Sequence, residues 1–406
     1  MNDPTAPERP AGHARALATV WFTLFLDLVS FGLILPVLPF YAAHFGASPW
    51  IVTTLSTVFS LAQFVMSPVL GRLSDRHGRR RIMLLSIGGS ALSQLVLGLA
   101  GALWMVFLAR LINGICNANI GTAHAYVADR VPPGERARYM GMMGSAIGLG
   151  FVVGPMVGGL LALEDMPHLP FLVASGLSAI NFLMAVFWLP ESHRPAAGAH
   201  LPARRSPFAL LRRDVWATPI AVFALIALGF YTAFSNMESS FALFTEARFR
   251  WTARETGYFF TFIGVVIAVM QGAVVGRVVK RLGERRTLLV GLVVMALGFL
   301  AQGGVPSVIA LVIGGAMTAG GNGLVNPSLS ALISRTSSRE DQGLNMGLVQ
   351  SASSLGRIAG PMAAGPLFEL LSPAAPLLFA GLLILRVLLY AARRVPDPPP
   401  LEPSPL

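Results

Sequence analysis

Ionisable side chains inside long apolar runs are the residues of this chain with the most chemistry to offer. Asp27 lies in the apolar run 16–41, and Arg110 lies in the run 103–128. An ionisable group in the middle of a bilayer is costly, so it is by default a candidate for function. Burial favours the neutral form of a carboxyl group, whereas a nearby guanidinium favours the carboxylate. A site balanced between these effects can take up and release a proton as its neighbours move, which is the chemistry of a proton-coupled carrier.

The depths of these two groups in the membrane are predicted to match. Asp27 lies about 16 Å along a helix that starts near residue 16, and Arg110 lies about 10 Å along a helix that starts near residue 103 at the opposite face. In a hydrocarbon core of about 30 Å the two groups then differ by about one helical turn, which the long arginine side chain can bridge. The sequence predicts a proton-coupling pair, and the alternative is a static buried ion pair that only fixes helix packing.

Glu238 is a third ionisable group, in the segment Tyr231-Thr-Ala-Phe-Ser-Asn-Met-Glu-Ser-Ser-Phe241. It could couple protons, bind a cationic substrate, or reach water at the outer end of its helix. The aromatic and methionine side chains of this segment, with amides from the first half of the chain, suit an amphipathic organic molecule. Ordinary helix packing is the alternative. The predicted binding residues are Gln63, Asn117, Asn119, Tyr231, Phe234, Glu238 and Phe241.

The elements that must position these residues are membrane helices. Of the 406 residues, 54% are hydrophobic and only 12% are charged, and the mean hydropathy is +0.66. These values predict an all-α polytopic membrane protein. Apolar runs predict twelve transmembrane helices, near 16–41, 50–70, 82–100, 103–128, 138–163, 169–189, 218–245, 255–276, 287–304, 306–333, 343–370 and 373–392.

Basic residues gather in alternate connecting segments, which predicts the orientation. These segments are 72–81, 130–138, 194–213, 277–286 and 335–339, whereas the opposite connections hold few arginines besides Arg248, Arg250 and Arg254. Positive segments stay in the cytoplasm, so both termini are expected there. The net charge of +11 could indicate nucleic-acid binding, but its placement indicates membrane topology instead. The single cysteine, Cys116, excludes an intramolecular disulfide and a cysteine-based metal cluster.

An internal repeat appears at an offset of about 205 residues. The segment 71–80 aligns with 276–285, and the Gly-Pro-Met of 154–156 aligns with that of 360–362. Parallel repeats of this kind occur in transporters with the binding cavity between two halves. We expect a tail over 1–15, a six-helix bundle over 16–189, a linker over 190–217, a pseudo-symmetric six-helix bundle over 218–392 and a tail over 393–406.

Two further segments are candidates for gating. The segment 71–81 holds five arginines and one aspartate, and is predicted to be a loop in which glycines permit sharp turns. Asp75 could accept hydrogen bonds from a helix N-terminus or pair with an arginine. A glycine-rich stretch in the run 138–163 predicts close, bendable helix packing. The predicted gating residues are Gly71, Asp75, Arg76, Gly78, Arg79, Arg80, Gly154 and Pro155.

The pattern G-x-L-x-D-R-x-G-R-R resembles the signature of the major facilitator superfamily, and G-x-x-x-G-P-x-x-G-G resembles the antiporter signature of its drug exporters. Four stretches are similar to tetracycline/proton antiporters: 26–39, Gln63 before the loop, 110–114 and 244–251. The resemblance implies alternating access, with Asp27 as a coupling carboxylate and Arg110 as its partner. It also implies an acid within 289–301 and a histidine within 258–276, and both are missing, which argues against a tetracycline–metal chelate as substrate.

The main hypothesis is an exporter of amphipathic compounds or drugs, tetracycline-like or multidrug, in exchange for protons at the cell inner membrane. Its expected partners are a small-molecule substrate, protons and the lipid bilayer, without nucleic acid, and it is expected to be a monomer. The alternatives are a proton-coupled metabolite carrier on the same scaffold and a non-transporting membrane sensor. The histidines are scattered and a nucleotide-binding G-x-x-x-x-G-K motif is missing, so we expect no enzyme, cofactor or metal site.

Overall fold

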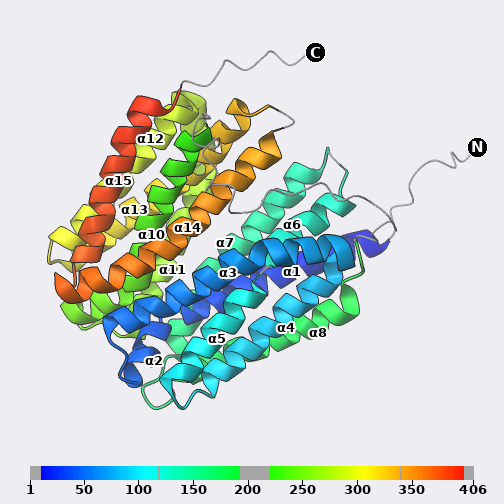
Figure 1. The fold of residues 1–406 in the computed structure, drawn as a ribbon, viewed down its shortest axis with the longest axis horizontal. Coiled ribbons are helices and arrows are strands. Elements are labelled where there is room, and N and C mark those ends of the chain that lie inside the picture. The colour runs from blue at the N-terminus through cyan, green and yellow to red at the C-terminus, as the bar shows by residue number, and fades with distance from the viewer. Residues whose placement is uncertain (1–10, 118, 133, 193–219, 339–340, 397–406) are drawn as a thin grey trace, which may run out of the picture.

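The computed structural model describes residues 11–117, 119–132, 134–192, 220–338 and 341–396. The first half of the chain forms helices α1 (Ala11–Ile34), α2 (Leu38–His44), α3 (Pro49–His77), α4 (Arg79–Gly98), α5 (Leu103–Cys116), α6 (Asn119–Arg130), α7 (Arg136–Leu161) and α8 (Leu169–Trp188). The second half forms α10 (Ile220–Phe249), α11 (Ala253–Val269), α12 (Val275–Gly304), α13 (Val308–Thr336), α14 (Gln342–Leu370) and α15 (Ala375–Arg394), with a short π-helix, Met270–Val274, between α11 and α12. The two halves lie side by side (Figure 1).

The helices have the length and composition of membrane spans. Ten segments of the described chain are long and apolar enough to cross a membrane. One of them, Ala253–Gly304, is 52 residues long and is interrupted at Gly283, whose φ of 76° is not helical, so it holds two of the expected spans. Together with α14, which is 29 residues long, the two halves reach twelve spans. The predicted twelve-helix, all-α membrane fold is confirmed.

The prediction of a loop over 71–81 is wrong, because almost all of this segment is helical. Helix α3 continues through Gly71 and ends at His77, and α4 begins at Arg79. Only Gly78 lies outside a helix, with φ at 100°. Arginine and leucine are good helix formers, so α3 continues until this one residue takes a conformation that L side chains avoid.

Two predicted helices are broken. The first expected span ends at Ile34 and continues as the short α2, because Pro36 and Pro39 disrupt helical hydrogen bonding. The fourth expected span divides into α5 and α6 at Asn117. The predicted linker, from residue 193 on, and most of the two predicted tails lie outside the described residues.

The repeat is visible in matching backbone and side-chain geometry. Gly78 and Gly283 both have positive φ. The residue two places on donates the same bond in each half: Arg80 to the carbonyl oxygen of Val186 at 2.6 Å, and Arg285 to that of Ala392 at 2.9 Å. The two residues that accept these hydrogen bonds, Val186 and Ala392, are 206 positions apart in the sequence, close to the predicted offset.

Each half has its own apolar core, and a further apolar cluster joins the two halves. We call the end of the molecule that holds Gly78 and Gly283 the arginine-rich end and the opposite end the far end. At the far end one cluster of buried apolar residues comes mainly from the first half but also contains Leu243 of α10 and Ala253 of α11, and Phe368 of α14 packs against it. The two halves therefore share one core at the far end.

The two halves approach most closely at the far end. A methyl group on Gly365 of α14 would stand 2.7 Å from the Cα of Trp50 in α3, and one on Gly257 of α11 would stand 2.8 Å from the Cα of Gly159 in α7. Towards the arginine-rich end α3 and α14 diverge (Figure 1), and a methyl group on Gly347 would meet open space. The two halves are therefore in close contact at the far end, and α3 and α14 are further apart towards the arginine-rich end.

Candidate functional site

A cavity of about 310 Å³ lies between the two halves. Its walls come from α1, α2, α3, α5, α6 and α7 of the first half and from α10 and α14 of the second half, so both halves are needed to form it. The cavity is lined by Asp27, Leu28, Phe31, Ile34, Leu35, Leu38, Pro39, Val52, Ser56, Phe59, Ser60, Gln63, Arg110, Asn117, Ile120, Ile147, Phe151, Tyr231, Phe234, Ser235, Glu238, Ser239 and Arg357. Most of the predicted coupling and binding residues are therefore brought to one place.

Two arginines, one from each half, face this cavity in the same way. The guanidinium carbon of Arg110 lies 4.4 Å from the ring centroid of Phe59, and that of Arg357 lies 4.9 Å from the ring centroid of Tyr231. Arg110 is 5% exposed, and its Nε has no hydrogen-bond partner among the described residues. Stacking on an aromatic face stabilises a guanidinium that little water reaches.

Glu238 lines the cavity together with the two arginines. The positive charges of Arg357 and, more weakly, of Arg110 act on its carboxyl group. Asp27 and Arg110 line the same cavity, and the carboxyl group of Glu238 acts electrostatically on Arg110. The site therefore combines two acids, Asp27 and Glu238, and two arginines, Arg110 and Arg357.

Amides and hydroxyls add hydrogen-bonding groups at two sides of the cavity. Gln63 donates to Asn117 with an Nε2–Oδ1 distance of 2.9 Å, at the point where α5 ends. The hydroxyl of Tyr231 donates to the side chain of Asn326 at 3.0 Å. Irregular backbone at membrane depth is tolerated where it lines a cavity, and Asn117 fits this rule.

One predicted binding residue, Phe241, lies elsewhere, and the side chain of another, Asn119, is outside the described part of the structure. Phe241 is fully buried and stacks on Phe259 of α11 with ring centroids 4.5 Å apart, so it belongs to the core of the second half and does not line the cavity. The position of Asn119 at the start of α6 is described, but its side chain is not. Three cavity phenylalanines that the sequence analysis did not single out form its apolar wall: Phe31, Phe59 and Phe151.

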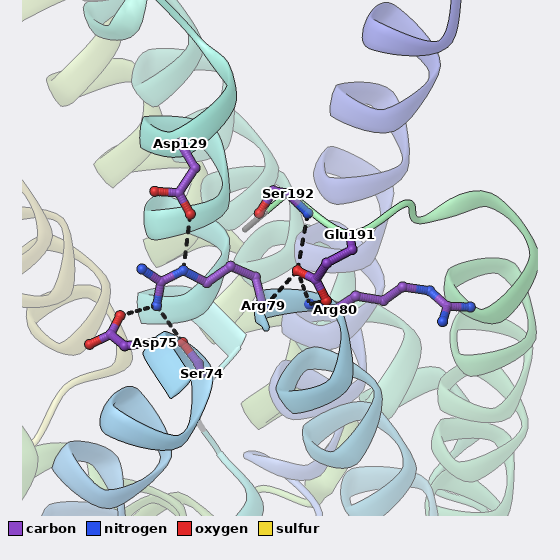
Figure 2. A network of polar contacts seen from close by, with 7 residues as sticks. All are labelled: Ser74, Asp75, Arg79, Arg80, Asp129, Glu191 and Ser192. Atoms are coloured by element: carbon purple, nitrogen blue, oxygen red, sulfur yellow. Dashed lines mark hydrogen bonds and ion pairs between the residues drawn. The ribbon is translucent and has the colours of Figure 1, made fainter. Parts of the chain in front are cut away.

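A network of charges surrounds Arg79 at the arginine-rich end (Figure 2). Its guanidinium pairs with Asp75 of α3 and with Asp129 of α6, the latter at 3.1 Å, and it donates to the hydroxyl of Ser74 at 2.5 Å. Arg79 is 8% exposed. The predicted pairing of Asp75 with an arginine is therefore present, whereas Arg76 is exposed to solvent.

The start of α4 is capped by Glu191, which the sequence analysis did not single out (Figure 2). Its carboxylate accepts the backbone N–H of Arg79 at 2.8 Å and that of Arg80 at 3.3 Å. A methyl group on Gly78 would stand 2.4 Å from this carboxylate. Glycine is needed here both for the positive φ and for the approach of Glu191.

The second half carries the same ion pair with the charges exchanged. Glu284 of α12 takes the place of Arg79, and it pairs with Arg335 of α13 at 2.6 Å. Arg335 takes the place of Asp129, because the two positions differ by the repeat offset of 206. Reversed charges keep the attraction within each half while making the two halves distinct at the arginine-rich end.

Gly154 and Pro155 lie where α7 meets α1. A methyl group on Gly154 would stand 2.7 Å from the backbone oxygen of Val29, and the Pro155 ring lies against Gly32. The backbone oxygen of Pro155 also lies close to Gly257 of α11. This stretch of α7 therefore packs closely both within its own half and across the two halves.

Comparison with known proteins identifies the family. The family model of the Major Facilitator Superfamily matches residues 20–277 and 240–406. The chain is 34% identical over 354 residues to a tetracycline resistance protein, class G, of Vibrio anguillarum, with 83% of this chain and 86% of the relative covered. It is 31% identical over 379 residues to multidrug resistance protein 2 of Bacillus subtilis (strain 168), covering 89% and 90%.

A solved structure agrees with these relatives. The human organic anion transporter MFSD10 superposes with a TM-score of 0.71 at 28% identity, covering 94% of this chain and all of that one. The chain is therefore a multi-pass membrane transporter, not an enzyme, and it belongs to the major facilitator superfamily.

Proposed function

We propose that this protein exports amphipathic organic compounds in exchange for protons by alternating access. The observation that carries the proposal is the cavity between the halves, where Asp27 and Glu238 stand among aromatic side chains and two arginines. Ionisable groups in such a place are costly without a function. Its relatives with tetracycline and multidrug resistance names support a foreign, amphipathic substrate.

In the proposed mechanism Asp27 carries the coupling proton and Arg110 is the basic group near it. Glu238 either takes part in proton transfer or contacts the substrate, together with Gln63 and Asn117. The aromatic side chains of Tyr231 and Phe234 would then hold the apolar body of the substrate. In this mechanism, binding of the substrate and binding of the proton weaken each other electrostatically. On each side of the membrane, one of the two is therefore released when the other binds.

The proposed orientation places the arginine-rich end in the cytoplasm, in the cell inner membrane. The described conformation would then be open to the cytoplasm and ready to accept substrate from it. Closing this end requires α3 and α14 to approach, and we propose that Asp75, Arg79 and Arg80 control that step. Gly154 and Pro155 would allow α7 to adjust while the far end opens.

A carrier of organic acids is the second candidate function. It is favoured by the two arginines in the cavity, of which Arg110 has an Nε without a hydrogen-bond partner among the described residues. A protonated Glu238 would leave both guanidiniums for a substrate anion, so proton and anion would assist one another. By linkage they would move in the same direction, which is opposite to the prediction for an exchanger.

The test is transport in proteoliposomes with an imposed pH gradient, for a panel of amphipathic dyes, antibiotics including tetracycline, and organic acids. Wild type is compared with Asp27→Asn, and with Asp165→Asn as a control, because Asp165 is an exposed acid at the far end. We expect substrate to move against the proton flow in wild type and in the control. In Asp27→Asn this coupled movement should be lost while the protein stays folded.

Two results would count against the proposal. Full pH-driven exchange in Asp27→Asn would remove Asp27 as the coupling site. Movement of an organic acid together with protons, and of no dye or antibiotic, would favour the second candidate.

A further inference from the structure

The N-terminus of α3 lacks a cap of its own. Ser48 has the extended backbone of an N-cap residue, with φ −70° and ψ 161°, yet its side chain makes no capping hydrogen bond. The equivalent helix of the second half, α11, is capped locally, because Thr252 and Glu255 form a capping box. A helix N-terminus has free N–H groups that favour a negative charge.

The cap of α3 comes from the other half of the molecule. The backbone N–H of Trp50 donates to Oε1 of Glu369 in α14 at 2.8 Å. One turn earlier on α14, Gly365 has no side chain to hold α3 away, and a methyl group there would stand 2.5 Å from the hydroxyl of Thr53. Gly365 therefore permits the close approach, and Glu369 bonds to the helix end that this approach brings near.

We infer that Glu369 is a positioning residue for alternating access, which caps α3 across the two halves while the far end is closed. Opening the far end separates α14 from α3, so this hydrogen bond must break and water must replace it. The helix α11 keeps its local cap in both conformations. Of these two repeat-related helices, only α3 therefore gains a bond from the other half on closure.

The inference rests on the alternating-access part of the proposed function and needs no knowledge of the substrate. Its measurement is the distance between spin labels on Leu99 and Leu371, which are exposed at the far end of the first and second halves. The background is Cys116→Ser, since Cys116 is the only cysteine of the chain. The test variant is Glu369→Ala and the matched control is Glu164→Ala, because Glu164 is an exposed acid at the same end.

We expect Glu369→Ala to raise the ratio of long to short distances about fivefold, the effect of losing one helix cap. The control should leave the ratio unchanged. An unchanged ratio in Glu369→Ala overturns the inference. If the ratio shifts although no compound is transported, the positioning role stands and the exporter proposal fails.

A second variant separates closure from the stability of α3. Ser48→Asp gives α3 a cap of its own, which is present in both conformations. Combined with Glu369→Ala, it should restore thermal stability but not the short distances. If it restores the short distances as well, Glu369 acts only on the stability of α3 and the positioning role is overturned.

Discussion

Gly78 must be a glycine for two reasons, its positive φ and the close approach of Glu191, and mutations can separate the two effects. Its φ of 100° is costly for any residue with a side chain, and its position leaves no room for a methyl group beside Glu191. We expect Gly78→Ala to destabilise the protein by about 2 kcal/mol or more, through backbone strain and loss of the Glu191 cap. Thermal unfolding in detergent measures the effect.

The repeat offers a matched control for this substitution. Gly283 also has a positive φ, but a methyl group there would meet open space. Gly283→Ala should therefore show the strain alone, and a smaller loss of stability. Equal losses in the two variants would mean that the contact with Glu191 contributes nothing.

At the same scale, the sequence identified charged residues better than aromatic ones. Asp27, Arg110 and Glu238 were predicted as site residues because a charge in an apolar run is costly, and all three line the cavity. Phe241 could not be distinguished from Phe234 in this way, since both are aromatic residues of one helix. Which face of that helix meets the cavity depends on packing against α11, which a single sequence does not contain.

The contact between helices α7 and α11 depends on two glycines facing each other at the far end. A methyl group on Gly257 would stand 2.6 Å from the backbone oxygen of Pro155 and 2.8 Å from the Cα of Gly159. Backbone atoms cannot move aside as a flexible side chain can, so Gly257→Ala should prevent the far end from closing. Transport should fall at least tenfold.

The matched control for this variant is Gly176→Ala, because a methyl group on Gly176 of α8 would meet open space. Labelling of a cysteine introduced at Val52, a buried cavity residue, should become faster from the outside in Gly257→Ala only. Normal transport by Gly257→Ala would show that α7 and α11 need not touch.

The ion pairs between α3, α4 and α6 lead to a prediction about turnover. Asp75 and Asp129 hold Arg79 at the arginine-rich end, far from the cavity lining. Asp75→Ala should slow turnover about tenfold through loss of a charge-assisted hydrogen bond, with little change in substrate affinity. A change in affinity alone, measured by equilibrium binding, would contradict a gating role.

Helix boundaries were predicted less well than helix number. Apolar runs indicate which residues prefer lipid, but α3 extends past its apolar run to His77, and the first residue with a non-helical φ is Gly78. The break at Asn117 was missed because it depends on a cavity that exists only when α3 and α5 come together, where Gln63 bonds to Asn117.

For the whole molecule, the repeat and the family resemblance predicted the architecture. Two halves related by an offset of about 205 residues predict a cavity between them, and both halves contribute its lining. The close contact at the far end and the divergence of α3 and α14 towards the arginine-rich end could not be predicted, because one sequence encodes every conformation of the transport cycle.

Proton–substrate exchange at this cavity requires that the two exclude each other from it. The most direct measurement adds a transported compound to purified protein in weakly buffered solution and follows pH with an indicator dye. Exchange requires that binding of the compound lowers proton affinity, so we predict proton release in wild type and none in Asp27→Asn. Proton uptake, or tight binding with no change of pH in wild type, would contradict the account.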